Sequence, residues 1–432
     1  MKHLFSGGVH PAPRKELSET SSAPALQPDT VVIPLRQHIG APCAPLVQVG
    51  DKVGVGQKIG DGEGLCVPVH ASVSGTVAAV EKRPCTGGEV LSVVIRNDYC
   101  DTPASALTPH ATADGLTAEQ IAGICREAGI VGMGGATFPT YVKAGTEGVD
   151  TLIANACECE PYITADDTLL QHAAADVLSG LAILKTALKP GRVVLAIEDN
   201  KRAAIGVLRS ALSGRSDVEL RVLPTRYPQG AEKQLIRAVT GREVPSGKLP
   251  KDVGCVVFNV STCAAIHRAV ILGQPLTERI VTVTGEAVKK PQNVTVRIGT
   301  SFAQVIEAAG GLTDDAGKVI AGGPMMGVAE SDLSVPVTKG TGAVLCLRRA
   351  QNDGDGQAQC IHCGKCSAAC PMGLQPMYLD HYAGQQDWEE LRRLHLEDCI
   401  ECGCCAYVCP AKQSLVERFR NAKHAMKEVS AK

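Results

Sequence analysis

Two copies of one cysteine spacing near the end of the chain constrain its fold more than any other feature. Each copy is a C-x2-C-x2-C-x3-C-P run, one over residues 360–371 and the other over residues 399–410. This spacing is typical of domains that hold two [4Fe–4S] clusters, in which the fourth cysteine of each run ligates the other cluster. The runs therefore predict two clusters with crossed ligands. We assign one cluster to Cys360, Cys363, Cys366 and Cys409, and the other to Cys399, Cys402, Cys405 and Cys370.

Two other uses of cysteine explain the runs less well. A disulfide framework suits a small secreted chain, and the first residues do not resemble a signal peptide. Zinc sites also use C-x2-C pairs, but a duplicated four-cysteine run ending in Cys-Pro is more specific. Cys404 lies outside both runs, and we expect it to be a spare thiol packed against a cluster. The domain is thus predicted to move single electrons.

Composition limits the remaining possibilities. A length of 432 residues predicts about three or four domains. The net charge of −2 gives no reason to expect a nucleic-acid partner. Nineteen cysteines without a secretory signal indicate a reducing compartment. The sequence contains no run of about 18 apolar residues without charges, so no transmembrane helix is predicted. Membrane association is therefore expected to come through a partner.

The first quarter of the chain predicts an arm and a small β domain. Residues 1–30 are rich in Pro, Ser and Gly and predict an extended N-terminal arm. Short alternating runs separated by Val-Gly-Asp and Val-Ser-Gly turns follow in residues 31–105. They resemble the barrel-sandwich hybrid of lipoyl and biotinyl carriers, without the carrier lysine in the turn near Gly62 to Leu65. We interpret His38 and His70 as structural histidines rather than metal ligands, since neither has a second ligand spaced nearby.

The middle and later parts predict two further domains. In residues 106–278, strands alternate with helices of ten or more residues, which predicts a parallel sheet covered on both faces. Ligands of such sheets bind at the carboxyl ends of strands, here the loops after Ala156, Pro224 and Val260. Residues 279–350 predict a small ubiquitin-like, or β-grasp, α+β domain. The segment NDGDGQ, residues 352–357, predicts a linker within the start of the cluster domain, residues 351–432.

A second chemical site is predicted in the α/β domain. Gly132, Gly134 and Gly135 crowd a turn between two predicted helices, where backbone N–H groups can approach an anion. A plain glycine-rich turn explains this motif equally well on its own. Lys143, about two turns into the next predicted helix, is expected to hold a phosphate.

An acidic loop follows the strand at residues 151–156. Glu158 and Glu160 lie in NACECEP, at the expected ligand edge of the sheet, with Asn155 just before them. Carboxylates and an amide there suit hydrogen bonds to a polar ring or ribose, although a solvated acidic loop is the alternative. Cys157 and Cys159 form a weak C-x-C pair without a third ligand nearby.

Several segments carry a family resemblance. GMGGATFPTYVKA, NACECEP, RYPQGAEKQLI and FNVST occur in the order seen in the flavin-bearing, NADH-oxidising subunit of respiratory complex I. The chain is more similar to the C subunit of the Rnf (Rsx) ion-translocating electron-transport complexes. FSGGVHP, VVIPLRQHIGAPC, VHASVSGTV, ECEPYITAD, AGGPMMG and both cysteine runs carry that resemblance, over about residues 3–415. The domain after Ile280 is similar to the soluble-ligand-binding module that these subunits share.

The resemblance implies a set of cofactor contacts. The expected FMN-binding residues are Gly132, Gly134, Gly135, Lys143, Asn155, Glu158, Glu160, Tyr227, Asn259 and Thr262. Glu158 and Glu160 are expected to serve the flavin reaction. Met133 stands where the complex I family has Arg, Cys157 where it has Asp, and Ala231 where it has an acid, although Glu232 remains. These departures concern the nucleotide contacts more than the flavin contacts.

The predicted function joins the two sites. A flavin accepts a hydride from NADH and releases electrons singly to iron–sulfur clusters. The resemblance implies a peripheral subunit on the cytoplasmic side of the bacterial inner membrane, with non-covalent FMN, two [4Fe–4S] clusters and NAD(H) as substrate. Its partners would be a ferredoxin-like subunit and integral membrane subunits, with ferredoxin reached indirectly and ion translocation performed by the partners. The alternatives are a cobalamin reductase of the propanediol-utilisation type and an electron-conducting adaptor with an empty flavin pocket.

Overall fold

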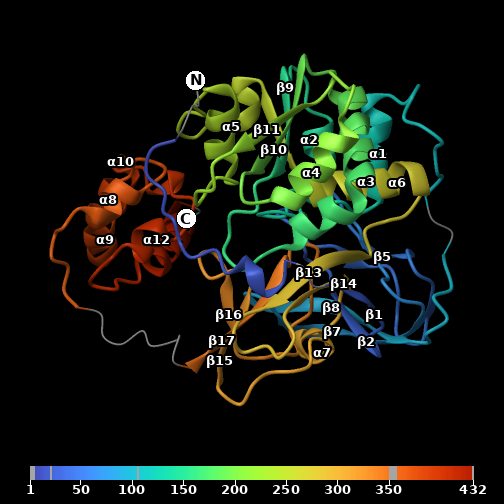
Figure 1. Ribbon diagram of the computed structural model, residues 1–432. Coiled ribbons are helices and arrows are strands. Elements are labelled where there is room, and N and C mark those ends of the chain that lie inside the picture. The colour runs from blue at the N-terminus through green and yellow to red at the C-terminus, as the bar shows by residue number, and fades with distance from the viewer. Residues whose placement is uncertain (1–4, 20–21, 105–106, 350–357, 431–432) are drawn as a thin grey trace.

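The computed structural model describes residues 5–19, 22–104, 107–349 and 358–430. Three domains pack together, and the cysteine-rich domain lies to one side of them (Figure 1). The predicted linker at residues 352–357 lies outside the described residues. In the described part of the chain, no helix is both long and apolar enough to cross a membrane.

The β domain consists of two small sheets, with strand orders β2-β8-β7-β4 and β3-β5-β6. Its core is built from β-branched and other apolar side chains that alternate inward along the strands, such as Val31, Ile33 and Ile95. Residues 62–68 join β5 to β6 at the predicted carrier turn. The strands are β2 (Thr30–Pro34), β3 (Ala44–Pro45), β4 (Lys52–Val53), β5 (Lys58–Asp61), β6 (Val69–His70), β7 (Gly75–Cys85) and β8 (Gly88–Asn97).

The α/β domain contains a parallel sheet with strand order β11-β10-β9-β12. Buried Val, Ile and Leu fill both faces of the sheet, as expected for parallel strands covered by helices. The chain order reverses between β9 and β12, and a ligand crevice is expected at the carboxyl ends of such a pair. Its elements are α1 (Ala118–Glu127), α2 (Thr140–Ala144), β9 (Thr151–Ala156), α3 (Ala165–Leu188), β10 (Arg192–Glu198), α4 (Arg202–Ala211), β11 (Glu219–Leu223), α5 (Glu232–Thr240), η2 (Pro250–Val253), β12 (Cys255–Asn259) and α6 (Val260–Leu272).

Helix α1 begins where its sequence predicts, whereas α2 is shorter than predicted. The capping box of Thr117 and Gln120 begins α1, as predicted. The helix after the glycine-rich turn is a single turn, Thr140–Ala144, which ends at Gly145. The prediction that Lys143 lies two turns into a helix was therefore wrong, and Lys143 is close to the glycine-rich turn in sequence and in structure.

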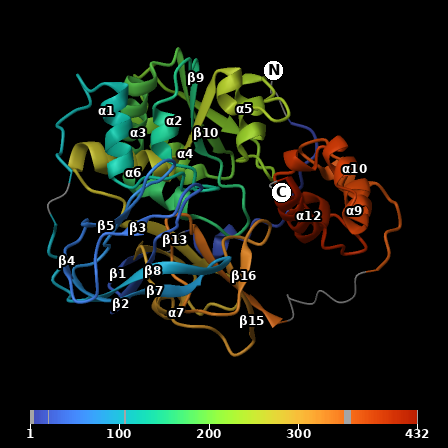
Figure 2. The same ribbon diagram turned by 180° about the vertical axis from the view of Figure 1, so that it is seen from behind.

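The β-grasp domain has a six-stranded sheet with order β1-β14-β13-β17-β15-β16. β13 and β14 form an antiparallel hairpin, and β13 pairs in parallel with β17. Ser301 and Gln304 form the capping box of the domain's helix. The elements are β13 (Glu278–Thr284), β14 (Gln292–Arg297), α7 (Phe302–Ala308), β15 (Ala316–Ala321), β16 (Val328–Glu330) and β17 (Ala343–Arg348). In Figure 2 the β-grasp and barrel-sandwich strands lie below the α/β domain.

The first thirty residues are more than an arm. The segment contains η1 (Lys15–Leu17) and β1 (Ser22–Leu26), and β1 pairs in parallel with β14 of the β-grasp domain. The prediction of a separate arm missed this strand because its pairing partner lies about 270 residues further along the chain and leaves no local pattern. Earlier in the segment, the N–H of Gly8 donates to the carbonyl of Ala369 at 2.9 Å. The segment thus ties the cysteine-rich domain to the other domains.

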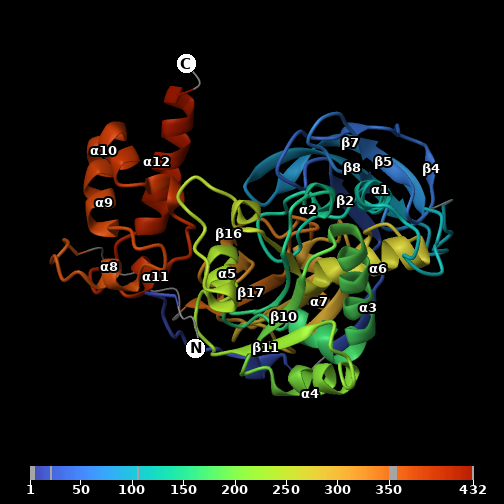
Figure 3. The same ribbon diagram turned by 90° about the horizontal axis from the view of Figure 1, so that it is seen from above.

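The cysteine-rich domain is a small helical unit. Figure 3 shows α9 and α12 running beside each other within it, and α10 packs against α9. Leu379, Leu391, Leu396, Phe419 and Met426 form its apolar core. Its elements are α8 (Lys365–Ala369), α9 (Pro376–Gln385), α10 (Trp388–Arg393), η4 (Leu396–Asp398), α11 (Cys404–Tyr407) and α12 (Leu415–Ser430).

Candidate functional site

The two cysteine runs share left-handed backbone positions. His362 and Glu401 occupy equivalent positions, each with φ of 56°, and the next left-handed residues are Gly364 (φ 72°) and Gly403 (φ 80°). Left-handed residues in a tight loop let successive N–H groups point inward toward an anion. In the second run the N–H of Glu401 already donates to Sγ of Cys399 at 3.4 Å. The repeat in sequence is therefore also a repeat in structure.

Four cysteines from the two runs line one pocket in this domain. Cys399, Cys402 and Cys405 come from the second run, and Cys370 comes from the end of the first. Apolar side chains, including Met372, Leu374 and Phe419, make up most of the remaining lining, which Glu401 and Cys404 also border. Among the described residues, no three His, Cys, Asp or Glu side chains gather tightly enough for a single metal ion. Four thiols around an apolar pocket fit the donor set of a cubane cluster, and we call this pocket, with its four ligand cysteines, the inner site.

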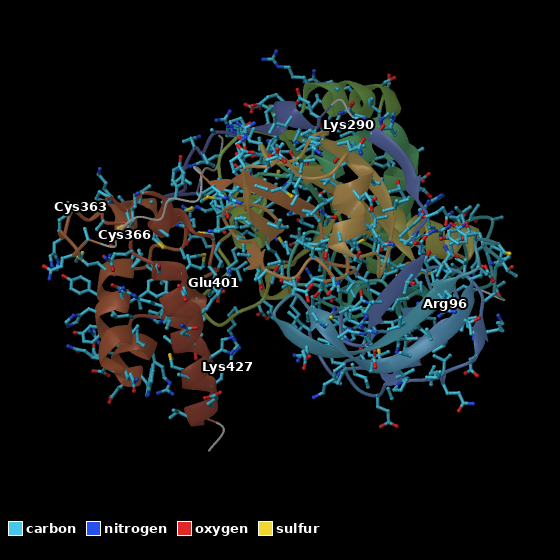
Figure 4. The ribbon with its side chains drawn as sticks, turned by 90° about the horizontal axis from the view of Figure 1, so that it is seen from below. Arg96, Lys290, Cys363, Cys366, Glu401 and Lys427 are labelled. Carbon is cyan, nitrogen blue, oxygen red and sulfur yellow. The ribbon has the colours of Figure 1, made fainter. Side chains whose placement is uncertain are left out.

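The remaining cysteines of the runs lie further out. Cys360 and Cys363 are exposed, and Cys366 and Cys409 are half-buried. The N–H of Ala358 donates to the carbonyl of Ala411 at 3.2 Å, which brings the start of the first run to the end of the second. Figure 4 shows Cys363 and Cys366 at the outer edge of the domain, away from the other three domains. We call this group the outer site.

The glycine-rich turn lies at the carboxyl edge of β9 and β12. The N–H of Met133 donates to Oγ1 of Thr262 at 3.0 Å. A Cβ on Gly134 would come within 2.6 Å of Nδ2 of Asn259, whereas Gly135 faces open space. None of the described residues accepts a hydrogen bond from the N–H groups of Gly134 and Gly135. This exposed set of free amides is a cradle that fits an anionic group such as a flavin phosphate.

Lys143 points toward a carboxylate. Its Nζ lies 2.6 Å from Oε1 of Glu232 and donates to the carbonyl of Val257 at 3.1 Å. Both charged side chains are partly exposed, 30% for Lys143 and 39% for Glu232. The predicted phosphate contact would therefore require Lys143 to exchange its partner.

Glu158 belongs to a buried charge network. Its Oε2 lies 3.0 Å from Nζ of Lys201, and its Oε1 accepts from the N–H of Asp166 at 2.8 Å. Burial would raise the pKa of Glu158, but the charges of Lys201 and Lys15 outweigh it and lower the pKa. Glu158 is therefore an ionised, fixed carboxylate inside the loop and not a solvated side chain.

Lys15 is a site residue that the sequence did not reveal. Its Nζ donates to the carbonyls of Glu158 (2.8 Å), Glu160 (3.0 Å) and Ile163 (2.6 Å), and its side chain is buried. Burial and the nearby charge of Lys201 lower the pKa of Lys15 to about 8. A single lysine in a Pro-rich segment carries no motif that would connect it to a loop 145 residues away.

Glu160 and Tyr227 face the cysteine-rich domain. Oε1 of Glu160 accepts from the N–H groups of Met325 (2.7 Å) and Met326 (3.1 Å) in the β-grasp domain. The hydroxyl of Tyr227 donates to the carbonyl of Cys402 at 2.7 Å, and both residues are buried in one apolar cluster with Cys404. Burial raises the pKa of Glu160. These two residues thus lie at the junction between the α/β domain, the β-grasp domain and the inner site.

Two amides, an acid and an arginine lie at the crevice. Nδ2 of Asn155 donates to the carbonyl of Gly230 at 2.8 Å, and Nδ2 of Asn259 donates to Asp166 at 2.6 Å. Burial raises the pKa of Asp166 to about 6. Arg279 is buried behind the turn, and burial lowers its pKa to about 10. Lys201, Asp166 and Arg279 were missed because each reaches the site from another element without a spacing motif.

His38 and His70 are both buried inside the protein. Nε2 of His38 accepts from the N–H of Val67 at 3.1 Å, and burial lowers its pKa to about 4. Burial likewise lowers the pKa of His70 to about 3. Both rings are therefore neutral, as expected for structural histidines.

The α/β domain has an anion cradle at one edge of its parallel sheet and contacts the four-cysteine pocket through Tyr227. This combination indicates a flavin and iron–sulfur electron-transfer protein. Four family models match: the RnfC barrel sandwich hybrid domain at residues 3–100, the Nuo51 FMN-binding domain at 125–268, the SLBB domain at 280–329 and the 4Fe-4S dicluster domain at 359–413. The chain therefore contains an FMN-binding domain and a two-cluster domain, and the predicted set of domain types is confirmed.

Relatives identify the family. The C subunit of the Na⁺-translocating ferredoxin:NAD⁺ oxidoreductase complex of Acetobacterium woodii is 47% identical over 432 residues, covering 98% of this chain and 97% of the relative. The proton-translocating counterpart of Clostridium ljungdahlii is 45% identical over 396 residues, or 90% and 86% of the two chains. The C subunit of the ion-translocating oxidoreductase complex of Pectobacterium atrosepticum is 43% identical over 403 residues, which span 91% of this chain and 58% of that longer protein. The chain belongs to the family of C subunits of the Rnf-type ion-translocating oxidoreductase complexes.

A solved structure shares the fold. The NAD⁺-reducing [NiFe]-hydrogenase in its H₂-reduced state aligns with a TM-score of 0.52 at 20% sequence identity, over 74% of this chain and 65% of that chain. Together with the family matches, the relatives favour the first of the three predicted functions over a cobalamin reductase or an adaptor without flavin.

Proposed function

We propose that this protein is the nucleotide-oxidising or nucleotide-reducing subunit of a ferredoxin:NAD⁺ oxidoreductase complex. FMN, when bound, supplies the exchange between the two-electron chemistry of NAD(H) and the one-electron chemistry of the clusters. The observation that carries the proposal is the hydrogen bond of 2.7 Å from the Tyr227 hydroxyl to the Cys402 carbonyl. This hydrogen bond joins the α/β domain directly to the inner site through two buried residues.

Residues of the crevice would bind and orient the flavin and nucleotide. The amides of Gly134 and Gly135, with Gly132 behind them, would hold the phosphate, and Lys143 would join them by leaving Glu232. Asn155, Asn259 and Thr262 would fix the turn and the strand ends, since all three already bond to neighbouring backbone or side chains. Glu158 would orient the nicotinamide or its ribose, held in place by Lys201 and Lys15.

The two clusters would be used in a fixed order. The inner site, with Cys370, Cys399, Cys402 and Cys405, touches the α/β domain through Tyr227. The outer site, with Cys360, Cys363, Cys366 and Cys409, lies at the far edge of the domain and is partly exposed. Electrons would therefore pass between the crevice and the inner cluster, and between the outer cluster and a partner.

We further propose partners and a location for this subunit. The outer site suits a ferredoxin-like subunit as the next carrier, with ferredoxin reached through it. Integral membrane subunits would couple the electron flow to ion movement, and this subunit would sit peripherally on the cytoplasmic side of the bacterial inner membrane. We also propose the domain limits 1–30, 31–105, 106–278, 279–350 and 351–432, with the first segment woven into the other domains through β1 and Lys15.

The proposal is tested by anaerobic purification, assay of flavin and iron, and addition of NADH. We expect bound FMN, about eight irons per chain, and bleaching of the cluster absorbance by NADH. A protein with both cofactors loaded that NADH does not bleach would refute nucleotide oxidation and leave the adaptor function.

A further inference from the structure

The two equivalent cysteine runs differ in charge at one position. Glu401 accepts from Nε of Arg420 at 2.8 Å and from Nζ of Lys423 at 2.9 Å. At the same place in the first run, Nδ1 of His362 lies 3.2 Å from Sδ of Met377. Among the described residues, no ion pair forms at His362. The two runs therefore differ in their surroundings. A network of charged side chains lies beside the inner site, and the described residues form no such network at the matching position of the outer site.

Lys423 is the member of this network that reaches the inner run itself. Besides Glu401, its Nζ donates to the carbonyl of Cys399 at 2.5 Å, and its side chain is 17% exposed. The helix that carries it, α12, is fixed because Phe419, Ala422 and Met426 are buried in the domain core. Figure 4 shows Glu401 near the base of α12 and Lys427 further along the same helix.

The network leaves one positive charge beside the inner site, because Arg420 and Lys423 outnumber the single carboxylate of Glu401. Reduction of a thiolate-bound cluster adds one negative charge to a group that is already anionic. A partly buried cation favours that extra charge more than an exposed cation does, because water screens it less. Charges and hydrogen bonds around the ligands are among the factors that set cluster potentials.

We propose that Lys423 raises the reduction potential of the inner cluster, and that Glu401 partly offsets it. Lys423 is a positioning and tuning residue, since it acts through the Cys399 loop and through its charge. The consequence is that the inner cluster holds an electron more strongly than its duplicated loop alone would. The inference rests on the proposed ligand assignment of the inner site and does not depend on the direction of electron flow.

The test is a redox titration of the full chain with both clusters loaded, followed by EPR. Lys423→Met should make one-electron reduction of the inner cluster about tenfold less favourable, which lowers the reduction potential of that cluster by ~59 mV. Lys427→Met is the matched control, because it removes the same charge from an exposed position one turn further along α12. It should leave both potentials unchanged. Repeating Lys423→Met in a Cys363→Ser background, which lacks an outer ligand, should retain the shift.

A second variant distinguishes a change in charge from damage to the cluster. Glu401→Gln removes the negative charge, so it should move the inner potential upward, opposite to Lys423→Met. Potentials equal to the Lys427→Met control in both variants, or a shift confined to the outer cluster, would overturn the proposal. Failure of the proposed function would look different, because NADH would then not bleach the clusters of the unmutated protein, whereas the redox titration measures their potentials without NADH.

Discussion

Lys143 offers a prediction in which two interactions of known size compete. In the structure its ammonium pairs with Glu232 at 2.6 Å, and the two side chains are 30% and 39% exposed. An exposed pair of this kind contributes about 0–1 kcal/mol. A charge-assisted bond to a flavin phosphate contributes about 1.5–3 kcal/mol. The exchange of partners is therefore favourable by about 0.5–3 kcal/mol, and Lys143 should leave Glu232 when FMN binds.

Lys143→Ala should accordingly weaken FMN binding by about twofold to 150-fold. Glu232→Gln should strengthen binding, because Lys143 no longer has to leave a carboxylate and an anion near the phosphate is removed. FMN affinity is measured by fluorescence quenching on the anaerobic flavin-free protein with its clusters intact. Lys251→Ala, an exposed cation on η2 of the same domain, is the control and should bind FMN normally. An unchanged affinity in Lys143→Ala would refute the partner exchange.

Four further predictions concern the other site residues. Cys370→Ser should remove the inner cluster by iron assay and EPR while the outer cluster stays, and Cys404→Ser should leave both; loss of the outer cluster in Cys370→Ser would reverse the ligand assignment. Glu158→Gln should oxidise NADH slowly with FMN fully bound and dithionite still reducing both clusters, because orientation for hydride transfer is lost; a normal rate would show that the loop does not position the nucleotide. Burial raises the pKa of Glu198 to about 7, so the folded state binds this proton more tightly than the unfolded state. The free energy of unfolding should therefore fall as pH rises from about 4.5 to 7. Glu198→Gln should flatten that pH dependence in thermal melts, and an unchanged slope would contradict the pKa shift. FMN should be released by acid precipitation, because the amides of Gly134 and Gly135 would hold its phosphate without a covalent bond; flavin retained in the pellet would indicate a covalent bond.

Features with a local pattern could be predicted from the sequence. The cysteine spacing predicted two equivalent loops, and His362 and Glu401 indeed have the same φ of 56°. Alternating strands and helices predicted the parallel sheet, and the capping residue Thr117 marked the start of α1 correctly. In each case the signal lies within a short stretch of chain, where periodicity and capping chemistry operate.

Features that depend on distant contacts could not be predicted. β1 gains its hydrogen bonds from β14, and Lys15 gains its acceptors from the loop at 158–163, so neither has a signature in its own segment. The expected flavin roles of Glu160 and Tyr227 were carried over from a resemblance. In the structure their polar atoms bond to Met325, Met326 and Cys402, and their flavin roles stay a prediction.

We expect electrons to enter or leave the crevice through the inner cluster. Anaerobic stopped-flow mixing with NADH, with rapid freezing for EPR, tests it on two single-cluster variants with full FMN. Cys363→Ser, which lacks an outer ligand, should still show fast reduction of the inner cluster. Cys370→Ser, which lacks an inner ligand, should lose fast reduction of its remaining outer cluster, while dithionite still reduces that cluster. Fast NADH reduction of the outer cluster in Cys370→Ser would contradict the proposed route.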